Sequence, residues 1–117
     1  MTTFRMTMLV CADLARSRDF YRDKIGLAVG TDVSPHWVDF DLGGGAQLGL
    51  HPADGRLPVQ PGSMSIGFTV DDVDALVASL ERDGVTIVNE PFDENFGRLA
   101  VVADPDGYPV QLLTPKR

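Results

Sequence analysis

Two apolar, strand-like runs near the C-terminus flank the polar sequence Asp-Pro-Asp-Gly. The runs cover residues 99–103 and 108–113, and the turn sequence covers residues 104–107. Proline presets φ, aspartate side chains bond the nearby backbone and glycine accepts a positive φ, so this spacing predicts a β-hairpin. An isolated hairpin is marginally stable in water, and we therefore expect another layer to cover its apolar face.

Two stretches have the periodicity of an amphipathic helix. The first runs from Asp13 to Gly26, with apolar side chains at positions 14, 21 and 25. In the second, aspartates at positions 71 and 72 precede an apolar stripe at positions 73, 76, 77 and 80, and Gly84 follows. Aspartate is a favoured N-cap and glycine a favoured helix end, so each predicted helix has both a start and a stop signal.

The remaining apolar runs predict further strands. Alternation is clearest in residues 64–70, where large apolar side chains alternate with small residues. The triple glycine at positions 43–45 predicts a hairpin turn, because the Lys-Ser/Thr pair of a phosphate-binding loop does not follow it. These predicted strands are residues 4–11, 27–32, 36–42, 46–51, 64–70 and 85–88, with a connector at 52–62 and a polar loop at 89–97.

The same order of elements occurs twice along the chain. A strand, an acidic cap, a helix, a glycine stop and three strands occupy residues 4–51 and again residues 64–113. The offset is about 59 residues from Met6 to Ser65 and about 62 residues from Gly49 to Gln111. Repeats that cannot bury their own apolar face pair with one another. We therefore predict an α+β chain of tandem βαβββ units with curved mixed sheets, forming one domain with units at about 4–53 and 64–114.

Charge and composition exclude several classes of partner. The formal net charge is −7 and no Lys/Arg cluster is present, which argues against nucleic acid as a partner because phosphates require a basic patch. The acidity either favours a cationic ligand or only keeps the protein soluble. No apolar run approaches the ~20 residues that span a bilayer, and the N-terminus lacks the apolar core of a secretory signal, so we expect a cytoplasmic protein that does not bind membranes. The single cysteine, Cys11, is expected in the core.

Three segments together cover nearly the whole chain: ADLARSRDFYRDKIGL, FTVDDVDALVASLERDGV and FGRLAVVADPDGYPVQLL. With their pairing of FYRDxxGL and DPDGxxxxL on a tandem repeat, they resemble the vicinal oxygen chelate superfamily. That superfamily includes glyoxalase I, extradiol dioxygenases, fosfomycin-resistance enzymes and bleomycin-resistance proteins. The resemblance implies the glyoxalase/bleomycin-resistance fold and a homodimer, since the half-cavities of such a fold are commonly completed across chains.

The resemblance also implies where a metal site would lie. Metal-using members take two ligands from each unit, one on its first strand and one on its last. Those positions correspond here to Met6 and Gly49 in the first unit and to Ser65 and Gln111 in the second. Only Gln111 offers a suitable oxygen, and the nearest alternative, His51, would be joined by neutral amides alone. We therefore predict that the chain uses no metal and no cofactor.

The alternation within the strands predicts that one face of each sheet lines a ligand pocket. Methionines are adaptable and glycines leave room for a guest, although such glycines also mark bulges. Aromatic rings offer stacking surface, and carboxylates at positions 90, 93 and 94 beside two of them suit a planar cation. Arg98 either binds an anionic group or pairs with a loop carboxylate. The predicted ligand-binding residues are Met6, Met8, Trp37, Gln47, Gly49, His51, Ser65, Gly67, Phe92, Phe96, Arg98 and Gln111.

Three functions fit these features. The first is a metal-free binding protein that sequesters a drug-like or aromatic small molecule between curved sheets of a homodimer. The second is a lyase or dioxygenase of the same superfamily with a degenerate site around His51 and Gln111, in which His51 is the candidate catalytic residue because imidazole transfers protons near neutral pH. The third is a structural or regulatory dimer whose cavity is filled by its own side chains.

Overall fold

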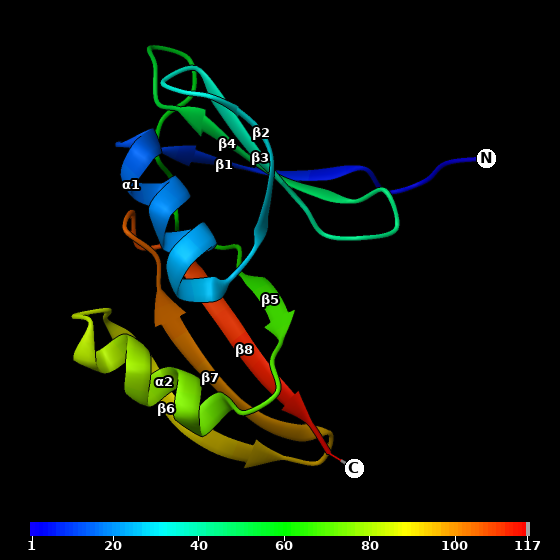
Figure 1. Cartoon of the computed structure of the whole chain (residues 1–117), viewed down its shortest axis with the longest axis vertical. Helices are drawn as coiled ribbons and strands as arrows, with labels where there is room; N and C mark the ends of the chain where they lie inside the picture. The colour runs from blue at the N-terminus through cyan, green and yellow to red at the C-terminus, as the bar shows by residue number, and fades with distance from the viewer. Residues whose placement is uncertain (117) are drawn as a thin grey trace. The chain divides into compact units, whose positions relative to one another are not determined.

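The computed structural model describes residues 1–116, and the chain divides into two compact units. Unit 1 is Met1–Gln60, and unit 2 begins at Pro61. Each unit contains a four-stranded sheet with a helix packed on one face, which confirms the predicted α+β class (Figure 1). That the two units make up one domain stays a prediction. No helix among residues 1–116 has the length and apolarity needed to span a bilayer.

Unit 1 has the strand order β1-β4-β3-β2, in which β1 and β4 are parallel and the other neighbours are antiparallel. Helix α1 packs on β3 and β4, and the side chains buried beneath it include Leu9, Phe40 and Leu50. The elements of unit 1 are β1 (Met6–Cys11), α1 (Leu14–Asp19), the π-helical continuation η1 (Phe20–Ile25), β2 (Ala28–Val33), β3 (Trp37–Asp41) and β4 (Gln47–Pro52).

The first helix begins and ends where the sequence predicts, but it changes type part-way. Asp13 accepts a hydrogen bond from the backbone N–H of Arg16, and Gly26 ends the helix at a φ of 91°. From Phe20 onward the turns widen into a π-helix, in which the carbonyl of Tyr21 accepts from the N–H of Gly26 five residues later. Apolar spacing does not distinguish this wider turn from an α-helix, so the sequence predicts the helix and both its ends but not the change to a π-helix.

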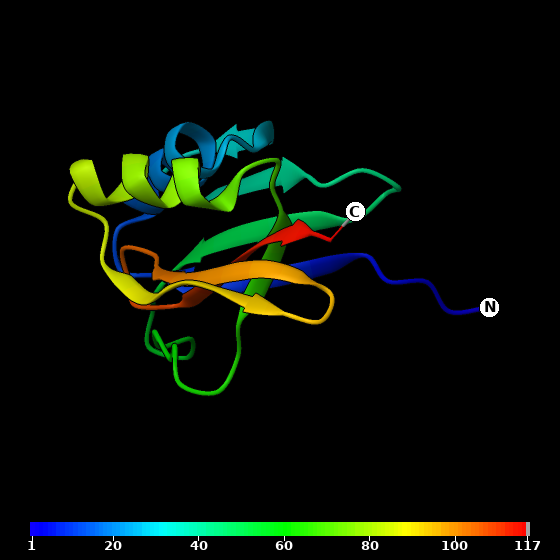
Figure 2. The same ribbon diagram turned by 90° about the horizontal axis from the view of Figure 1, so that it is seen from below.

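Unit 2 repeats the topology with the strand order β5-β8-β7-β6, again with the first and last strands parallel. Helix α2 lies over one face of this sheet and contacts β6, β7 and β8 (Figure 2). Val77 and Leu80 of the helix and Val110 of β8 are buried. Asp72 caps the helix by accepting from the N–H of Ala75. The elements of unit 2 are β5 (Ile66–Thr69), α2 (Val73–Arg82), β6 (Ile87–Glu94), β7 (Gly97–Ala103) and β8 (Pro109–Pro115).

The polar loop predicted at residues 89–97 is mostly strand. Strand β6 continues to Glu94 and pairs with β7 across two irregularities, one on each side of Asn89. It is an edge strand, which accounts for its polar composition and for the tolerance of Pro91 within it. Prediction from composition alone failed here, because a polar edge strand and a polar loop have similar residues.

Strand register makes the two units equivalent residue by residue. Met8 pairs with Gly49 across the parallel strands of unit 1, and Gly67 pairs with Gln111 across those of unit 2. Met8 and Gly67 are separated by the offset of about 59 residues, and Gly49 and Gln111 by the offset of about 62 residues, that the repeated pattern predicts. The tandem βαβββ arrangement is therefore confirmed.

Each sheet has a second face that its own helix does not cover, and we call it the open face. Alternation along the paired strands assigns its residues, because the buried core residues take the intervening positions. The open face of unit 1 comprises Met6, Met8, Val10, Trp37, Asp39, Asp41, Gln47, Gly49 and His51. That of unit 2 comprises Gly67, Thr69, Phe92, Leu99, Val101, Gln111 and Leu113.

Candidate functional site

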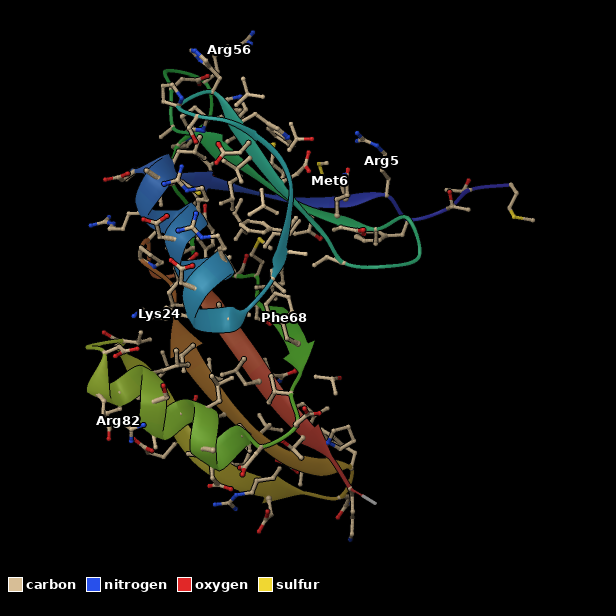
Figure 3. All side chains as sticks on the ribbon, viewed as in Figure 1. Arg5, Met6, Lys24, Arg56, Phe68 and Arg82 are labelled. Carbon is tan, nitrogen blue, oxygen red and sulfur yellow. The ribbon has the colours of Figure 1, made fainter. Side chains whose placement is uncertain are left out.

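The open face of unit 1 carries one large aromatic side chain, Trp37 on β3. A Cβ atom added at Gly49 on the neighbouring strand would lie 2.5 Å from Cη2 and 2.8 Å from Cζ2 of this indole. The ring therefore lies across the backbone at Gly49, in space that any larger residue would occupy. The Sδ atom of Met6, labelled on β1 in Figure 3, lies 3.0 Å from the same point. Trp37, Gly49 and Met6 thus form one packed group on the open face.

A buried carboxylate holds the indole in this position. The Nε1–H of Trp37 donates to Oδ2 of Asp39 at 2.8 Å, and the backbone N–H of Thr31 donates to Oδ1 of Asp39 at 2.9 Å. Asp39 is only 6% exposed. A hydrogen bond to a charged group contributes about 1.5–3 kcal/mol, so the orientation of the ring is strongly favoured.

A shift in the pairing of the edge strand β2 leaves space for the carboxylate of Asp39. The pairing of β2 with β3 shifts between Val29 and Thr31, and Gly30 lies at the shift. A Cβ at Gly30 would come within 2.6 Å of Oδ1 of Asp39. Glycine is therefore required at position 30 for Asp39 and at position 49 for the ring of Trp37, and the two glycines come from different strands.

His51 extends the same group along β4. Its ring lies edge-on to Trp37, with ring centroids 6.4 Å apart and an interplanar angle of 72°. The Nδ1 atom lies 2.7 Å from the carbonyl oxygen of Pro52, so in the neutral ring Nδ1 carries the proton and Nε2 is left as an acceptor. The partner of His51 is thus a backbone carbonyl, whereas a catalytic base is usually oriented by a carboxylate.

On unit 2 the predicted residues Gly67 and Gln111 are register partners. Oε1 of Gln111 would lie 3.3 Å from a Cβ at Gly67, so the amide lies beside the glycine. A shallow hollow of about 220 Å³ opens here, lined by Gly67, Phe68, Thr69, Gln111 and Leu113. Phe92 pairs with Leu99 on the same open face and is 39% exposed. This face therefore combines an amide with apolar and aromatic surface.

Three predicted residues lie elsewhere. Ser65 precedes β5, and Phe96 is in the turn between β6 and β7. Arg98 donates to both oxygens of Asp74 on α2, at 2.9 and 3.2 Å, and to Asp93 at 3.0 Å. These hydrogen bonds raise the pKa of Arg98. The guanidinium is therefore already paired with two carboxylates, although it borders a larger hollow of about 430 Å³.

Comparison with known proteins identifies the family. The model of the Glyoxalase/Bleomycin resistance protein/Dioxygenase superfamily matches residues 3–112, which is nearly the whole chain. The chain belongs to this superfamily.

Relatives of similar length come from several bacteria. YaeR of Escherichia coli (strain K12) is 32% identical over 117 residues, covering 89% of each chain. The phenazine antibiotic resistance protein EhpR of Enterobacter agglomerans is 29% identical, with 94% of this chain and 90% of EhpR covered. Among solved structures, the crystal structure of TnmS3, an antibiotic binding protein from Streptomyces sp. CB03234, has a TM-score of 0.79 at 27% identity, over 99% of this chain and 98% of TnmS3.

The donor atoms at the four metal positions that the resemblance implies do not fit a divalent ion. In unit 1 the space beside Gly49 is filled by the ring of Trp37, and the other position is the thioether of Met6. In unit 2 the positions are Ser65 and the neutral amide of Gln111. Zinc and similar divalent ions take imidazole, thiolate or carboxylate ligands, and hard ions take several oxygen ligands, most often with carboxylates among them. Residues 1–116 contain no group of three His, Cys, Asp or Glu side chains placed to hold a metal ion.

The sequence analysis did not include two residues that support Trp37 in the candidate site, Asp39 and Gly30. The signal for Asp39 was present, because it lies two residues after Trp37 and alternation places both side chains on one face. The sequence contained no signal for Gly30, because its role depends on a shift in the pairing of β2 with β3 that strand periodicity does not reveal.

Proposed function

We propose that this chain binds a flat aromatic small molecule against Trp37 on the open face of unit 1, and that it does so without a metal. The main support is the fixed indole, held by Asp39 and seated across Gly49. An aromatic ring whose orientation is set before binding loses little entropy when a ligand stacks on it, which favours affinity.

The surroundings of the ring suit the same role. Met6 and Met8 supply adaptable apolar surface, and the half-buried His51 supplies a hydrogen-bonding edge. Pockets for small molecules typically combine apolar walls with a few polar groups of this kind. EhpR is named for phenazine antibiotic resistance, which fits a flat aromatic ligand, and TnmS3 is described as an antibiotic binding protein, which fits ligand binding without a stated ligand class.

Isothermal titration calorimetry with phenazine tests the proposal. The protein is treated with a chelator, and the wild type is compared with Trp37→Ala. Phe4→Ala serves as the control, because it also removes an aromatic ring, and Phe4 is exposed and lies outside the strands. We expect saturable binding in the wild type and in Phe4→Ala, and a loss of at least about tenfold in affinity, about 1.4 kcal/mol, in Trp37→Ala.

Two outcomes would contradict the proposal. One is binding that is equally strong in Trp37→Ala, which would place the ligand elsewhere. The other is binding or turnover that requires added zinc, nickel, manganese or iron, which would favour a degenerate enzyme site around His51 and Gln111.

A ligand present at 100 times its dissociation constant should also raise the free energy of unfolding by about 2.7 kcal/mol, which a thermal shift assay detects.

We also propose that the chain forms a homodimer. Exposed apolar side chains support this, including Met8 and Phe92 on the open faces, each 39% exposed, and Val88 on β6, 54% exposed. Sedimentation equilibrium should give twice the chain mass of 12.7 kDa. A monomer at all concentrations tested would contradict it.

A further inference from the structure

We propose that the site on Trp37 selects planar cations over neutral rings of the same shape, and that Asp39 is the positioning residue that sets this preference. The inference rests on the proposed function, because it concerns the same face of the same indole. It specifies that the preferred ligand is positively charged, and it assigns this preference to one buried side chain, that of Asp39.

The carboxylate of Asp39 has neutral partners. Its two oxygens accept from the indole N–H of Trp37 and from the backbone N–H of Thr31. Within residues 1–116, no Lys, Arg or His side chain forms an ion pair with it. The four strands of unit 1 contain no lysine or arginine. The carboxyl group of Asp39 is thus 94% buried and has two neutral hydrogen-bond donors as its partners.

The carboxylate of Asp39 acts on a ligand through the indole. The face of an aromatic ring is negative, and tryptophan is the strongest cation–π partner among the aromatic side chains. Donation of its N–H to a carboxylate increases the electron density of the ring. A cation stacked on the ring would therefore be attracted by the ring and by the carboxylate of Asp39 together.

A delocalised planar cation fits this arrangement better than a compact one. A compact ammonium is strongly hydrated and would lose that hydration against an apolar surface, whereas a planar, delocalised charge loses less. Met6 and Met8 offer such an apolar surface beside the ring. A neutral ring of the same shape gains the stacking and burial but not the charge attraction. The net charge of −7 adds a longer-range attraction for any cation.

The test uses a matched pair of probes. These are 10-methylacridinium, which is permanently charged, and acridine, which has nearly the same shape and is neutral at pH 8. Affinities for the wild-type protein are measured by calorimetry at pH 8. We expect the cation to bind at least about tenfold more tightly, and we expect Asp39→Asn to reduce this ratio to about threefold or less.

Asp41→Asn is the matched control variant. Asp41 lies two residues further along β3 on the same open face, but it is exposed and bonds the backbone N–H of Gly43. It changes the net charge by the same amount as Asp39→Asn without contacting Trp37. We expect it to retain the preference for the cation. An equal loss in both variants would overturn the role of Asp39, because net charge would then explain the preference.

Salt dependence provides a second measurement that needs no variant, in case Asp39→Asn does not fold. In about 1 M NaCl the Debye length is about 3 Å, which removes long-range attraction but leaves a partly buried contact. We expect most of the preference to remain in wild-type protein, and its disappearance would overturn the inference.

The probes also separate this inference from the proposed function. Equal affinities for the two rings would overturn the inference and leave the proposed function standing. Failure of both probes and of phenazine to bind would overturn both.

Discussion

Replacing Gly49 with alanine adds one methyl group at a point that the ring of Trp37 already occupies. The new Cβ would lie 2.5 Å from Cη2 of the indole, whereas two carbon atoms meet at about 3.5 Å. The ring must therefore move by at least about 1 Å. A displacement of this size is enough to break the 2.8 Å hydrogen bond between Nε1 and Asp39.

The expected cost follows from these two effects. A lost hydrogen bond to a charged group costs about 1.5–3 kcal/mol, and overpacking of a filled site costs about 1–3 kcal/mol, with some relief because the side chain can rotate away. We expect Gly49→Ala to lower the free energy of unfolding by about 2 kcal/mol. Because Trp37 is the only tryptophan, its fluorescence emission should shift to longer wavelength as the indole becomes more exposed to water.

Urea unfolding followed by far-ultraviolet circular dichroism measures the stability change independently of the fluorescence. Gly62→Ala is the matched control, because a Cβ at Gly62 meets no atom within 4 Å. In a Trp37→Ala background, Gly49→Ala should cost less than about 0.5 kcal/mol, since the remaining neighbour is the flexible end of Met6. An unchanged emission maximum, or the same cost in both backgrounds, would refute the packing of Trp37 on Gly49.

Three further predictions concern the fold that supports this site. Asp72→Ala should destabilise the protein by about 1 kcal/mol in thermal unfolding, because Asp72 caps α2, while Asp71→Ala should change stability by less than about 0.5 kcal/mol. Asp104→Ala should cost about 2 kcal/mol in urea unfolding, because the buried Asp104 carboxylate accepts from two backbone N–H groups in the β7–β8 turn. Hydrogen bonds from Ser34 lower the pKa of Asp32, so its stabilising contribution is present above ~pH 3.9 and is lost as the pH falls through the lowered value. Asp32→Asn should therefore flatten the acid limb of a plot of urea midpoint against pH, and an unchanged limb would show that Asp32 does not contribute to it.

Features that depend on a few neighbouring residues could be predicted from the sequence. The helix caps at Asp13 and Asp72 and the positive φ of Gly26 follow from side-chain chemistry that acts within one turn. The hairpin turn at residues 104–107 is of the same kind, with Gly107 at a φ of 90°. The repeated order of elements could be predicted for the same reason, because each unit contains its own aspartate cap, glycine stop and apolar strand runs.

Features that depend on pairing between strands were predicted less well. The strand predicted at residues 85–88 continues as β6 to Glu94, and this continuation was missed because its residues are mostly polar and only their pairing with β7 makes them a strand. Alternation correctly places Met6, Gly49 and His51 on one face of the sheet, and their role in a binding site stays a prediction. The seating of Trp37 on Gly49 needs the register of β3 against β4, which the sequence does not specify.

The indole N–H resonance of Trp37 offers the most direct test of ligand binding at this ring. The chain has one tryptophan, so a ¹H–¹⁵N correlation spectrum contains a single indole signal to follow while phenazine is added to chelator-treated protein. We expect that signal to be protected from solvent exchange by its bond to Asp39 and to move in a saturable way as phenazine binds. An indole signal that stays unchanged while phenazine saturates the protein would contradict binding against Trp37.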